Sequence, residues 1–518
     1  MRGIVACRTD DPAVDDDAAS AVTETAGDVV EDFIAAAGRW PDRTALAYNG
    51  MPTTYSALAE RVRIVSMRYA RELGVADESK RIAVSVSHNP AMAEHLLGIM
   101  QAGATYCPID AALPDARKQA LIATLGVHRL FTTGRDENPT APEVLPFEPV
   151  RDQHDPAYVL CTSGSTGAPK PVAVSRHALA VTVRELRRLF ALTPEDRVLQ
   201  FASLGWDTCL EEILPTLTAG ATLVFDDAAH SGSFPLFIRM LTEQRVTVLD
   251  LPTAFWHELV LFLYNDRAVL PDTVRLVIIG GERVDATRLQ QWRDLDVGHV
   301  GLLNTYGCTE TTLVTHAVQL SGLGADLELA PYEDDIPVGR PLPHVRDHIT
   351  DDGELLVAGP GLATGYLASP ELTDSAFPVV DHGSGPTRWF CTGDLVTRGQ
   401  RGLLYSRGRR DEQVKVRGVR VHPAEVEAQL TSHPAVGGAV VVGEERLLGP
   451  TSLTAYVVQT GPSTPAELKR YLGERLPSQF VPTKVTYVAA LSYTASGKID
   501  RAATAQAAIH RDNRGDGR

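Results

Sequence analysis

The sequence has few cysteines, and their spacing contains no pattern that binds a metal or builds a network of bridges. The chain has six cysteines in 518 residues, and no two of them form a CxxC pair. A zinc signature and a disulfide scaffold are therefore both excluded. We expect each cysteine to be a small, reduced residue that fills space. The six are Cys7, Cys107, Cys161, Cys209, Cys308 and Cys391.

The sequence also lacks long apolar runs and an excess of positive charge. No apolar stretch approaches the length needed to cross a bilayer, and the start, MRGIVACRTDDPAVDDD, has no secretory hydrophobic region. Lys and Arg number 49 against 65 Asp and Glu, which gives a net charge of −16. Phosphate backbones require clustered positive charge, so no nucleic-acid partner is expected. We predict a cytoplasmic protein with no membrane partner.

The apolar pattern predicts an α/β protein of more than one domain. The chain is too long for a single hydrophobic core, and its 44% hydrophobic and 22% charged residues are typical of a globular protein. Short apolar runs alternate with longer periodic segments such as 175–192, which we predict to be a helix. This rhythm is typical of largely parallel sheets. The clearest strand candidates are RIAVSVS (81–87), ATLVFDD (221–227), VTVLDL (246–251) and VRLVIIGGE (274–282).

A change of composition near GRRDEQVKVRG (408–418) marks the predicted domain boundary, because this segment has almost no apolar content. The residues after it predict a compact α+β set. One of its helices has a clear start, since Thr464, Pro465 and Glu467 form a capping box with proline in the first turn. The predicted order is a mobile tail over 1–28, a large N-terminal domain over 29–408, a hinge over 409–411 centred on Asp411, a small C-terminal domain over 412–505 and a second tail over 506–518.

The stretch CTSGSTGAPKPVAV (161–174) predicts a phosphate-binding loop. Its glycines let the backbone aim N–H groups at an anion, and its hydroxyls add donors. A Walker loop is excluded, because no glycine precedes the lysine directly and no Ser or Thr follows it. The alternative is a flexible linker, which Gly/Ser-rich tracts commonly form. The apolar strand before the loop and the Pro-Lys after it favour the phosphate site. The residues concerned are Thr162, Ser163, Gly164, Ser165, Thr166, Gly167 and Lys170.

This loop resembles the signature loop of the adenylate-forming superfamily, which includes acyl-CoA synthetases, luciferases and the adenylation domains of nonribosomal peptide synthetases. Seven further stretches resemble the peptide-synthetase branch, in the same order as in that family. They are TTYSALAERV (53–62), MQAGATYCPID (100–110), WDTCLEEIL (206–214), NTYGCTETT (304–312), WFCTGDL (389–395), GRRDEQVKVRGVRVHPAEVE (408–427) and ASGKIDR (495–501). Together the eight motifs cover nearly the whole chain.

The resemblance implies an ATP site, in which a carboxylate attacks the α-phosphate of ATP. Both partners are anions, so positioning and charge neutralisation carry most of the catalysis. The 162–167 loop would bind the β,γ-phosphates and Lys170 would attract them. The other implied roles are Thr309 on the α-phosphate, Glu310 on Mg²⁺, Tyr306 stacked on adenine, Asn304 near the base edge, Asp394 on the ribose with Arg409 close by, and Lys498 bridging the attacking carboxylate and the ribose-phosphate.

The chain departs from the family pattern at four positions, none of which carries an assigned role. Pro171 follows the lysine where glycine is usual, and Cys308 stands where proline is common. Cys391 replaces a frequent arginine and His422 a frequent glutamate. Pro171 puts in doubt the mobility of the loop's far end and any role of Lys170 beyond phosphate attraction.

The resemblance also implies the class of acid that is activated. In amino-acid-activating members an aspartate binds the substrate's α-ammonium, and here Asp207 stands at that position. Fatty-acid-activating synthetases have no use for such a charge. Carried over without gaps, the other pocket positions are Thr208, Glu211, Asp250, Val277, Ile279, Thr305, Leu313 and Val314.

Glu211 and Asp250 predict a substrate with a second, distal cation. Glu211 lies one helical turn after Asp207, so both carboxylates can face one cavity. Asp250 ends an apolar strand, where an unpaired carboxylate is costly. A cationic side chain such as lysine, β-lysine or ornithine fits these three acids. The alternative is that Glu211, like Glu212, is an exposed helix acid and that Asp250 caps a turn.

The sequence predicts a free-standing enzyme, since no carrier segment follows Lys498 and no condensation domain precedes the core. It would load a separate carrier protein on its phosphopantetheine arm. By resemblance, rotation near Asp411 would withdraw Lys498 and bring Lys415 over the site. A small activator protein is a further possible partner. Two other hypotheses stay open: an acyl-CoA ligase, and a non-catalytic regulator that binds ATP or an amino acid.

Overall fold

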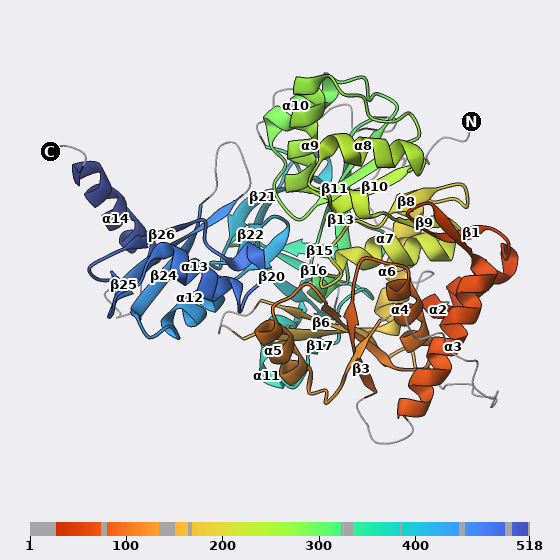
Figure 1. Cartoon of the computed structure of the whole chain (residues 1–518), viewed down its shortest axis with the longest axis horizontal. Helices are drawn as coiled ribbons and strands as arrows, with labels where there is room; N and C mark the ends of the chain where they lie inside the picture. Colours follow the sequence, from red (N-terminus) through yellow and green to blue (C-terminus); the bar gives the residue numbers. More distant parts are fainter. Residues whose placement is uncertain are drawn as a thin grey trace. The chain divides into compact units, whose positions relative to one another are not determined.

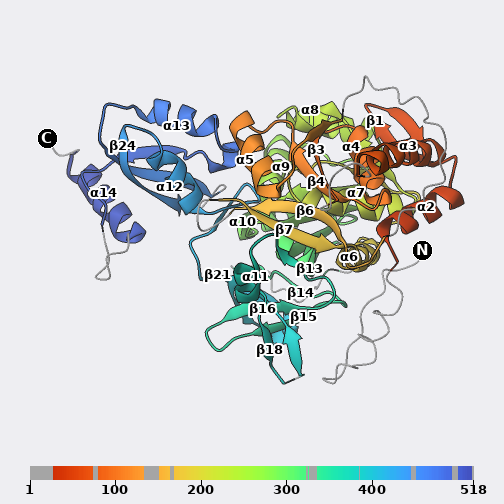
Figure 2. The same ribbon diagram turned by 90° about the horizontal axis from the view of Figure 1, so that it is seen from below.

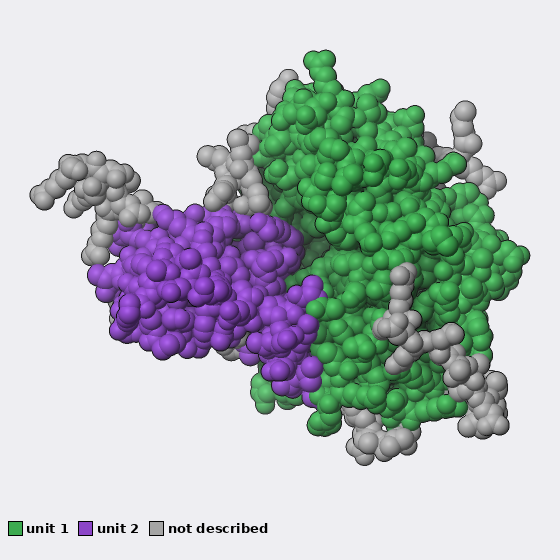
Figure 3. Space-filling view, viewed as in Figure 1, with its two compact units in different colours: residues 1–111, 127–160, 171–410 green, residues 112–126, 161–170, 411–518 purple. Residues whose placement is uncertain are grey.

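A computed structural model describes residues 27–73, 80–133, 151–163, 168–322, 325, 335–383, 385–444, 451–492 and 500–515. The chain divides into two compact units (Figure 3). Unit 1 comprises Met1–Ala111, Val127–Leu160 and Pro171–Arg410, and unit 2 comprises Ala112–Gly126, Cys161–Lys170 and Asp411–Arg518. Within the described parts of the chain, no helix combines the length and the apolar character that crossing a membrane requires.

Unit 1 is built around a nine-stranded sheet in the order β14-β13-β12-β11-β10-β8-β9-β1-β2. Neighbours from β12 to β1 are parallel, and the strands at both ends are antiparallel. The strands are β1 (Thr44–Tyr48), β2 (Met51–Thr54), β8 (Arg197–Leu199), β9 (Thr222–Phe225), β10 (Val248–Pro252), β11 (Leu276–Gly280), β12 (Gly301–Gly307), β13 (Val314–Ser321) and β14 (Arg340–Pro341).

Helices cover both faces of this sheet, because its central strands are apolar on both sides. Figure 1 shows α8, α9 and α10 gathered beside β10 and β11. One apolar cluster contains Leu249 and Val277, and another contains Val248 and Ile278 together with residues of α7. The helices are α2 (Val29–Arg39), α6 (Arg176–Leu189), α7 (Thr208–Ala219), α8 (Phe234–Glu243), α9 (Thr253–Asp266) and α10 (Ala286–Arg293), with a 3-10 turn η1 (Asp227–His230).

A six-stranded sheet has the order β17-β7-β6-β4-β3-β5, and helices α3 (Tyr55–Leu73) and α4 (Ala91–Gln101) belong to the same region of the chain. A four-stranded antiparallel sheet has the order β15-β16-β20-β21, and Figure 2 shows β15, β16 and β18 grouped with α11. The strands are β3 (Arg81–Val86), β4 (Thr105–Asp110), β5 (Leu130–Thr132), β6 (Pro156–Thr162), β7 (Lys170–Ser175), β15 (Arg346–Ile349), β16 (Glu354–Ala358), β17 (Gly365–Tyr366), β18 (Val379–Asp381), β19 (Pro386–Arg388), β20 (Phe390–Arg398) and β21 (Leu404–Arg409). The remaining helical turns are α11 (Pro370–Ala376), η2 (Thr309–Thr311) and η3 (Gln400–Gly402).

Unit 2 is a small α+β body whose main sheet has the order β24-β25-β26. A hairpin precedes that sheet, and its turn residues Arg417 and Gly418 have φ values of 51° and 79°, as a two-residue hairpin turn of type I′ requires. Thr464 and Glu467 form the expected capping box. The elements are α5 (Asp115–Leu125), β22 (Val414–Val416), β23 (Val419–Val421), α12 (Pro423–Thr431), β24 (Val436–Glu444), β25 (Ser452–Gln459), α13 (Pro465–Gly473), η4 (Ser478–Phe480), β26 (Lys484–Tyr487) and α14 (Arg501–Gly515).

The α/β fold class predicted from the apolar pattern is confirmed. All four predicted strands overlap an observed one, namely β3, β9, β10 and β11, and the helix predicted over 175–192 contains α6. The helix predicted from the capping box at Thr464 and Pro465 is α13. Helix α14 covers most of the segment 506–518, for which we expected a tail.

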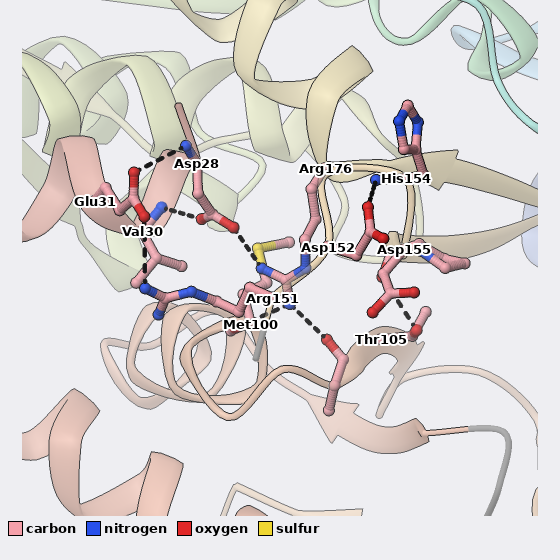
Figure 4. A network of polar contacts seen from close by, with 12 residues as sticks. Asp28, Val30, Glu31, Met100, Thr105, Arg151, Asp152, His154, Asp155 and Arg176 are labelled. Atoms are coloured by element: carbon pink, nitrogen blue, oxygen red, sulfur yellow. Dashed lines mark hydrogen bonds and ion pairs between the residues drawn. The ribbon is translucent and has the colours of Figure 1, made fainter. Parts of the chain in front are cut away.

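The predicted N-terminal tail ends in a polar network rather than in free chain (Figure 4). Residues 1–26 lie outside the described residues, but Asp28 caps α2 by accepting a hydrogen bond from Val30 N at 2.7 Å. The other oxygen of Asp28 accepts from Arg176 Nη1 at 2.7 Å. Arg176 is 3% exposed and also donates to the backbone oxygens of Met100 and Ala104. Asp28 therefore belongs to the folded core.

Candidate active site

Three of the predicted nucleotide-binding residues form one hydrogen-bonded group. Asp394 on β20 and Arg409 on β21 lie opposite each other in the strand register. Arg409 Nη1 lies 2.5 Å from Asp394 Oδ1, and the Tyr306 hydroxyl donates to Asp394 Oδ2 at 2.5 Å. Both side chains of the ion pair are about seven-eighths buried. The carboxylate is thus held between a cation and a phenol, with its orientation defined by both. We refer to Tyr306, Asp394 and Arg409 as the nucleotide group.

Asn304 lies two residues before Tyr306 on β12 and shares its face of the strand. Its side chain is buried, and Nδ2 donates to the backbone oxygen of Pro337 at 2.9 Å. Tyr306 itself contacts the ring of His316 edge-on, with centroids 5.7 Å apart. His316 Nε2 lies 3.2 Å from Asp347 Oδ2. Tyr306 is therefore supported on one side by a buried polar pair.

Thr309 and Glu310 lie on a tightly folded turn that follows β12. Both are buried in η2. The two residues that follow this turn, Thr312 and Leu313, have φ values of 57° and 68°. Positive φ at a β-branched residue is rare and occurs mainly at functional sites. A Cβ at Gly307 would lie 1.8 Å from the Leu313 backbone oxygen, so the turn requires glycine there.

Glu310 can supply one carboxylate to a cation. Among the described residues, no group of three or more His, Cys, Asp or Glu side chains is arranged to hold a metal. Mg²⁺ is usually bound by one or two carboxylates together with phosphate oxygens. The residues therefore fit a Mg²⁺ ion that is bound jointly with ATP, with Glu310 as its protein ligand.

The described part of the phosphate loop lies in unit 2, at the end of β6 and the start of β7. Ser163 is buried and its hydroxyl donates to the backbone oxygen of Arg420 at 2.9 Å. The Thr162 hydroxyl donates to the Lys170 backbone oxygen at 3.5 Å. The predicted residues Gly164, Ser165, Thr166, Gly167 and Lys498 lie outside the described residues.

The predicted hinge and Lys415 lie at the start of the 411–518 part of unit 2. Asp411 is exposed and accepts a hydrogen bond from Gln413 N at 3.3 Å. Lys415 is partly buried on β22, the first strand of the hairpin. The pivot at Asp411 and the role of Lys415 stay predictions.

The predicted acidic residues gather at the start of α7 and on β10. Glu211 is 8% exposed, Glu212 is 1% exposed and Asp250 is 5% exposed. The alternative in which Glu211 and Glu212 are exposed helix acids is therefore wrong. Asp250 lies inside β10, and its Oδ2 has no hydrogen-bond partner among the described residues. Asp207, at the N-terminus of α7, is half-buried. We refer to Asp207, Glu211 and Asp250 as the acid cluster.

Glu212, which is adjacent to Glu211 on α7, has three hydrogen-bond donors in the loop before the helix. It accepts hydrogen bonds from the backbone nitrogens of Phe201 and Ala202, each at 2.9 Å, and from Gln200 Nε2 at 3.1 Å. These bonds lower its pKa, although burial and the charge of Asp250 raise it above its ordinary value. The donors give Glu212 a structural role, in which it holds the loop before α7.

The charges of the acid cluster oppose one another. Burial raises the pKa of Glu211 well above its ordinary value, and the negative charges of Asp250, Asp207 and Glu212 raise it further. Burial raises the pKa of Asp250 from 3.8 to about 7. Two interacting carboxyls of this kind titrate together, with one holding its proton longer. A bound cation would remove the conflict.

Two of the carried-over pocket residues lie on the other face of the sheet. In the parallel register Asp250 pairs with Ile278, so these two side chains share a face, and Val277 and Ile279 point to the opposite one. Ile278 shares its apolar cluster with α7, whereas Val277 and Ile279 belong to the cluster beneath α8 and α9. Ile278 and Gly280 therefore lie on the same face of the sheet as Asp250, and the substrate-binding role of Val277 and Ile279 stays a prediction. The sequence held no signal for this, because only the register of β11 with β10 sets which residue lies beside Asp250.

The remaining carried-over positions lie on the same face as Asp250 or at the start of α7. Thr305 pairs with Gly280, and a Cβ at that glycine would lie 2.7 Å from Thr305 Oγ1. Leu313 and Val314 are both 2% exposed and share the apolar cluster of Ile278. Thr208 is the first residue of α7. The predicted positions outside the acid cluster thus include apolar side chains and the two hydroxyls of Thr208 and Thr305.

Tyr366 is a polar partner of the site that the sequence did not indicate. Its hydroxyl donates to Glu310 Oε1 at 3.1 Å from a segment more than fifty residues away along the chain. The tyrosine is 9% exposed. No spacing signal connects the two, because the contact depends on the pairing of β17 with β7.

Comparisons with known proteins identify the family of the chain. Residues 33–367 match the family of AMP-binding enzymes, and residues 425–498 match the AMP-binding enzyme C-terminal domain. The isonitrile lipopeptide synthase of Streptomyces coeruleorubidus is 39% identical over 481 residues, which are 89% of this chain and 32% of that protein. The dimodular nonribosomal peptide synthase of Bacillus subtilis is 30% identical over 89% of this chain and 20% of its own length. The chain thus spans a third or less of these two relatives.

A relative of similar length and two solved structures extend the comparison. Novobiocin biosynthesis protein H of Streptomyces niveus is 32% identical, covering 89% of this chain and 80% of its own length. NpsA-ThdA, an artificially fused adenylation-PCP di-domain from Klebsiella oxytoca, has a TM-score of 0.78 at 24% identity, over 89% of this chain and 93% of its own. The adenylation and PCP protein PA1221 has a TM-score of 0.80 at 22% identity, over 93% of this chain and 84% of its own. By fold and by sequence, the chain belongs to the AMP-binding enzyme family.

Proposed function

We propose that this chain is an adenylating ligase that activates a cationic amino acid, namely lysine, β-lysine or ornithine, as its aminoacyl-AMP. It would then transfer the aminoacyl group to the phosphopantetheine thiol of a separate carrier protein in nonribosomal peptide synthesis. The observation that supports the substrate class is the acid cluster, in which Glu211 and Asp250 are buried and the charges of Asp250 and Asp207 raise the pKa of Glu211. The relatives named as peptide synthases and adenylation-PCP proteins support the carrier.

Substrate binding would neutralise the acid cluster. Asp207 would accept the α-ammonium, and Glu211 and Asp250 would share the distal ammonium. Ile278, Leu313 and Val314 would contact the aliphatic stem. A neutral side chain would leave these carboxyls uncompensated, at a cost of about 3–5 kcal/mol by analogy with broken buried pairs.

ATP binding would use the nucleotide group. Tyr306 would stack on adenine, and Asp394 would accept the ribose hydroxyls while Arg409 holds its carboxylate in place. Asn304 would stand near the base edge. The turn bearing Thr309 would donate to the α-phosphate, and the 162–167 loop and Lys170 would bind the phosphates that leave.

Mg²⁺ would supply charge neutralisation on the phosphates, with Glu310 as its protein ligand. Lys498 would contact both the attacking carboxylate and the ribose-phosphate, and so would neutralise charge where the new bond forms. In the second half-reaction a thiol displaces AMP from the acyl carbon. Rotation near Asp411 would bring Lys415 to the site for that step.

Pyrophosphate exchange across a panel of α- and β-amino acids tests this proposal. We expect exchange that depends on lysine, β-lysine or ornithine, and little exchange with the neutral isostere norleucine. Exchange only with neutral or acidic amino acids would contradict the proposed cationic substrate but not the proposed adenylation activity. A CoA-dependent release of AMP with fatty or aryl acids would favour an acyl-CoA ligase, and an absence of exchange with any acid would favour a regulator. The panel is run with and without a small activator protein, because adenylation enzymes of this class can require one.

A further inference from the structure

The segment that bears Tyr366 contacts Glu310 in two places. The Tyr366 hydroxyl donates to Glu310 Oε1 at 3.1 Å. Nearby, the backbone nitrogen of Ala363 donates to the Glu310 backbone oxygen at 2.9 Å. Both the carboxylate and the backbone of Glu310 are thus held by one short segment of unit 1.

This segment is itself firmly braced. Gly365 has a φ of 143°, and a Cβ there would lie 2.4 Å from Thr373 Cγ2, so the turn requires glycine. The Tyr366 backbone nitrogen donates to Thr373 Oγ1 at 3.0 Å. Arg388 donates to the backbone oxygens of Ala363 and Thr364, each at 2.8 Å, and its guanidinium lies over the ring of Phe377 at 4.3 Å. The phenol therefore reaches Glu310 from a rigid support.

From this geometry we infer that Tyr366 is a positioning residue that orients the Glu310 carboxylate for the divalent cation that accompanies ATP. The inference rests on the proposed role of Glu310. The hydroxyl donates to one oxygen of the Glu310 carboxylate and so restricts the rotation of the group that would hold the cation. Mg²⁺ tolerates little deviation from octahedral geometry, so the orientation of its ligand matters. Partners that orient a metal ligand change metal affinity by about 10–100-fold.

Tyr366→Phe removes the hydroxyl and keeps the ring. We expect the Kd of Mn²⁺, measured by electron paramagnetic resonance on the full chain with a non-hydrolysable ATP analogue, to rise about tenfold. The Mg²⁺ concentration that half-activates pyrophosphate exchange should rise by the same factor. At saturating Mg²⁺ the rate should return to within about threefold of the wild type, since the acid cluster and the nucleotide group are unchanged. An unchanged melting temperature would show that the variant is folded.

The matched control is Tyr264→Phe, which removes a hydroxyl from a tyrosine that is 42% exposed on α9. It should leave the Mn²⁺ affinity unchanged. Glu310→Gln and the double variant with Tyr366→Phe complete a cycle. We expect the second change to have almost no further effect on cation affinity once Glu310→Gln is present.

The outcomes separate the inference from the proposed function. If Glu310→Gln weakens Mn²⁺ binding and Tyr366→Phe does not, the positioning role is wrong and the metal role of Glu310 stands. If Glu310→Gln also leaves Mn²⁺ binding unchanged, the proposed metal role is wrong, and the inference is overturned with it.

Discussion

The nucleotide group and the acid cluster are the two halves of the candidate active site, and their carboxyl groups have different surroundings. In the nucleotide group, Asp394 is paired with Arg409 and Tyr306 at 2.5 Å each. In the acid cluster, Glu211 is buried and faces the charges of Asp250 and Asp207. The Asp394 carboxylate is thus paired with a cation, whereas neighbouring negative charges raise the pKa of the Glu211 carboxyl.

Glu212 makes the comparison sharper because it is adjacent to Glu211 on the same helix. It is equally buried, yet it accepts three hydrogen bonds from residues 200–202. Burying a carboxylate without a partner costs several kcal/mol. Among the described residues Glu212 has three donors, whereas Asp250 Oδ2 has none, and this difference is the basis of the proposed role of Asp250 in substrate binding.

The largest effect should come from Lys498, which is predicted to contact both the attacking carboxylate of the amino acid and the ribose-phosphate of ATP. Lys498→Ala should lower the rate of adenylate formation by about 100-fold or more, because the lysine would stabilise charge that develops only in the transition state. ATP affinity, measured by calorimetry, should change little. Exchange at a near wild-type rate would contradict the catalytic assignment of Lys498.

Neutralising one acid of the cluster should come next. Asp250→Asn should lower kcat/KM for lysine-type substrates. The loss should correspond to about 2–4 kcal/mol of transition-state stabilisation, the range for truncating one partner of a buried charge pair. Glu212→Gln is the matched control. It should reduce stability by about 1–3 kcal/mol through its lost acceptor and preserve the preference for the cationic substrate. If both variants change that preference equally, the distinction between the two acids is wrong.

A change in the nucleotide half should affect ATP without affecting selectivity. Asp394→Asn loses the charge-assisted bond to Arg409 and an acceptor for ribose, so the KM for ATP should rise about tenfold or more. The ratio of lysine to norleucine activation should stay within about twofold of the wild type. Steady-state exchange kinetics with both amino acids measure the two quantities together. A large shift in the ratio would show that the halves are not independent.

The smallest effect should be a pH dependence that is specific to the acid cluster. The pKa of Asp250 is raised to about 7, so the carboxyl is increasingly protonated below that pH and attracts a cation less. The kcat/KM for the cationic substrate should rise between about pH 6 and pH 8, and Asp250→Asn should flatten this rise.

The contribution of Asp250 to the stability of the folded protein should change with pH in the opposite direction to kcat/KM. A raised carboxyl pKa means that the folded state binds more protons than the unfolded state between the ordinary value of 3.8 and about 7. The contribution of Asp250 to stability therefore falls as pH rises through that window. Urea unfolding of the wild type and of Asp250→Asn at pH 5 and pH 8 measures it, and the variant should gain most at pH 8. An equal difference at both pH values would contradict the raised pKa.

The sequence was sufficient to predict the fold class and the strands on which several of the candidate site residues lie. Apolar runs identified β3, β9, β10 and β11, because buried parallel strands are apolar on both faces. The same property hid the orientation of β11. The central residues of VRLVIIGGE are all apolar or glycine. The pattern therefore could not show whether Val277 or Ile278 faces Asp250. Only the register with β10 decides it.

Other contacts were beyond reach because they join distant segments. The donors of Glu212 are backbone groups, which any residue at 201 and 202 would supply. Likewise Tyr366 reaches Glu310 through the pairing of β17 with β7 and a glycine turn. The assignment of α5 to unit 2 has no local signal either, since Arg117 on α5 pairs with Glu425, more than three hundred residues further along the chain.

The most direct test of the acid cluster compares lysine with norleucine, which differs chiefly by the distal ammonium, in the wild type and in the double variant Glu211→Gln with Asp250→Asn. We predict that wild-type kcat/KM in pyrophosphate exchange favours lysine by about 100-fold or more. In the double variant this preference should fall below about tenfold, mainly through loss of activity on lysine. A wild type that activates both amino acids equally, or a double variant that keeps its full preference for lysine, would contradict the claim that these buried carboxyls recognise a second cation.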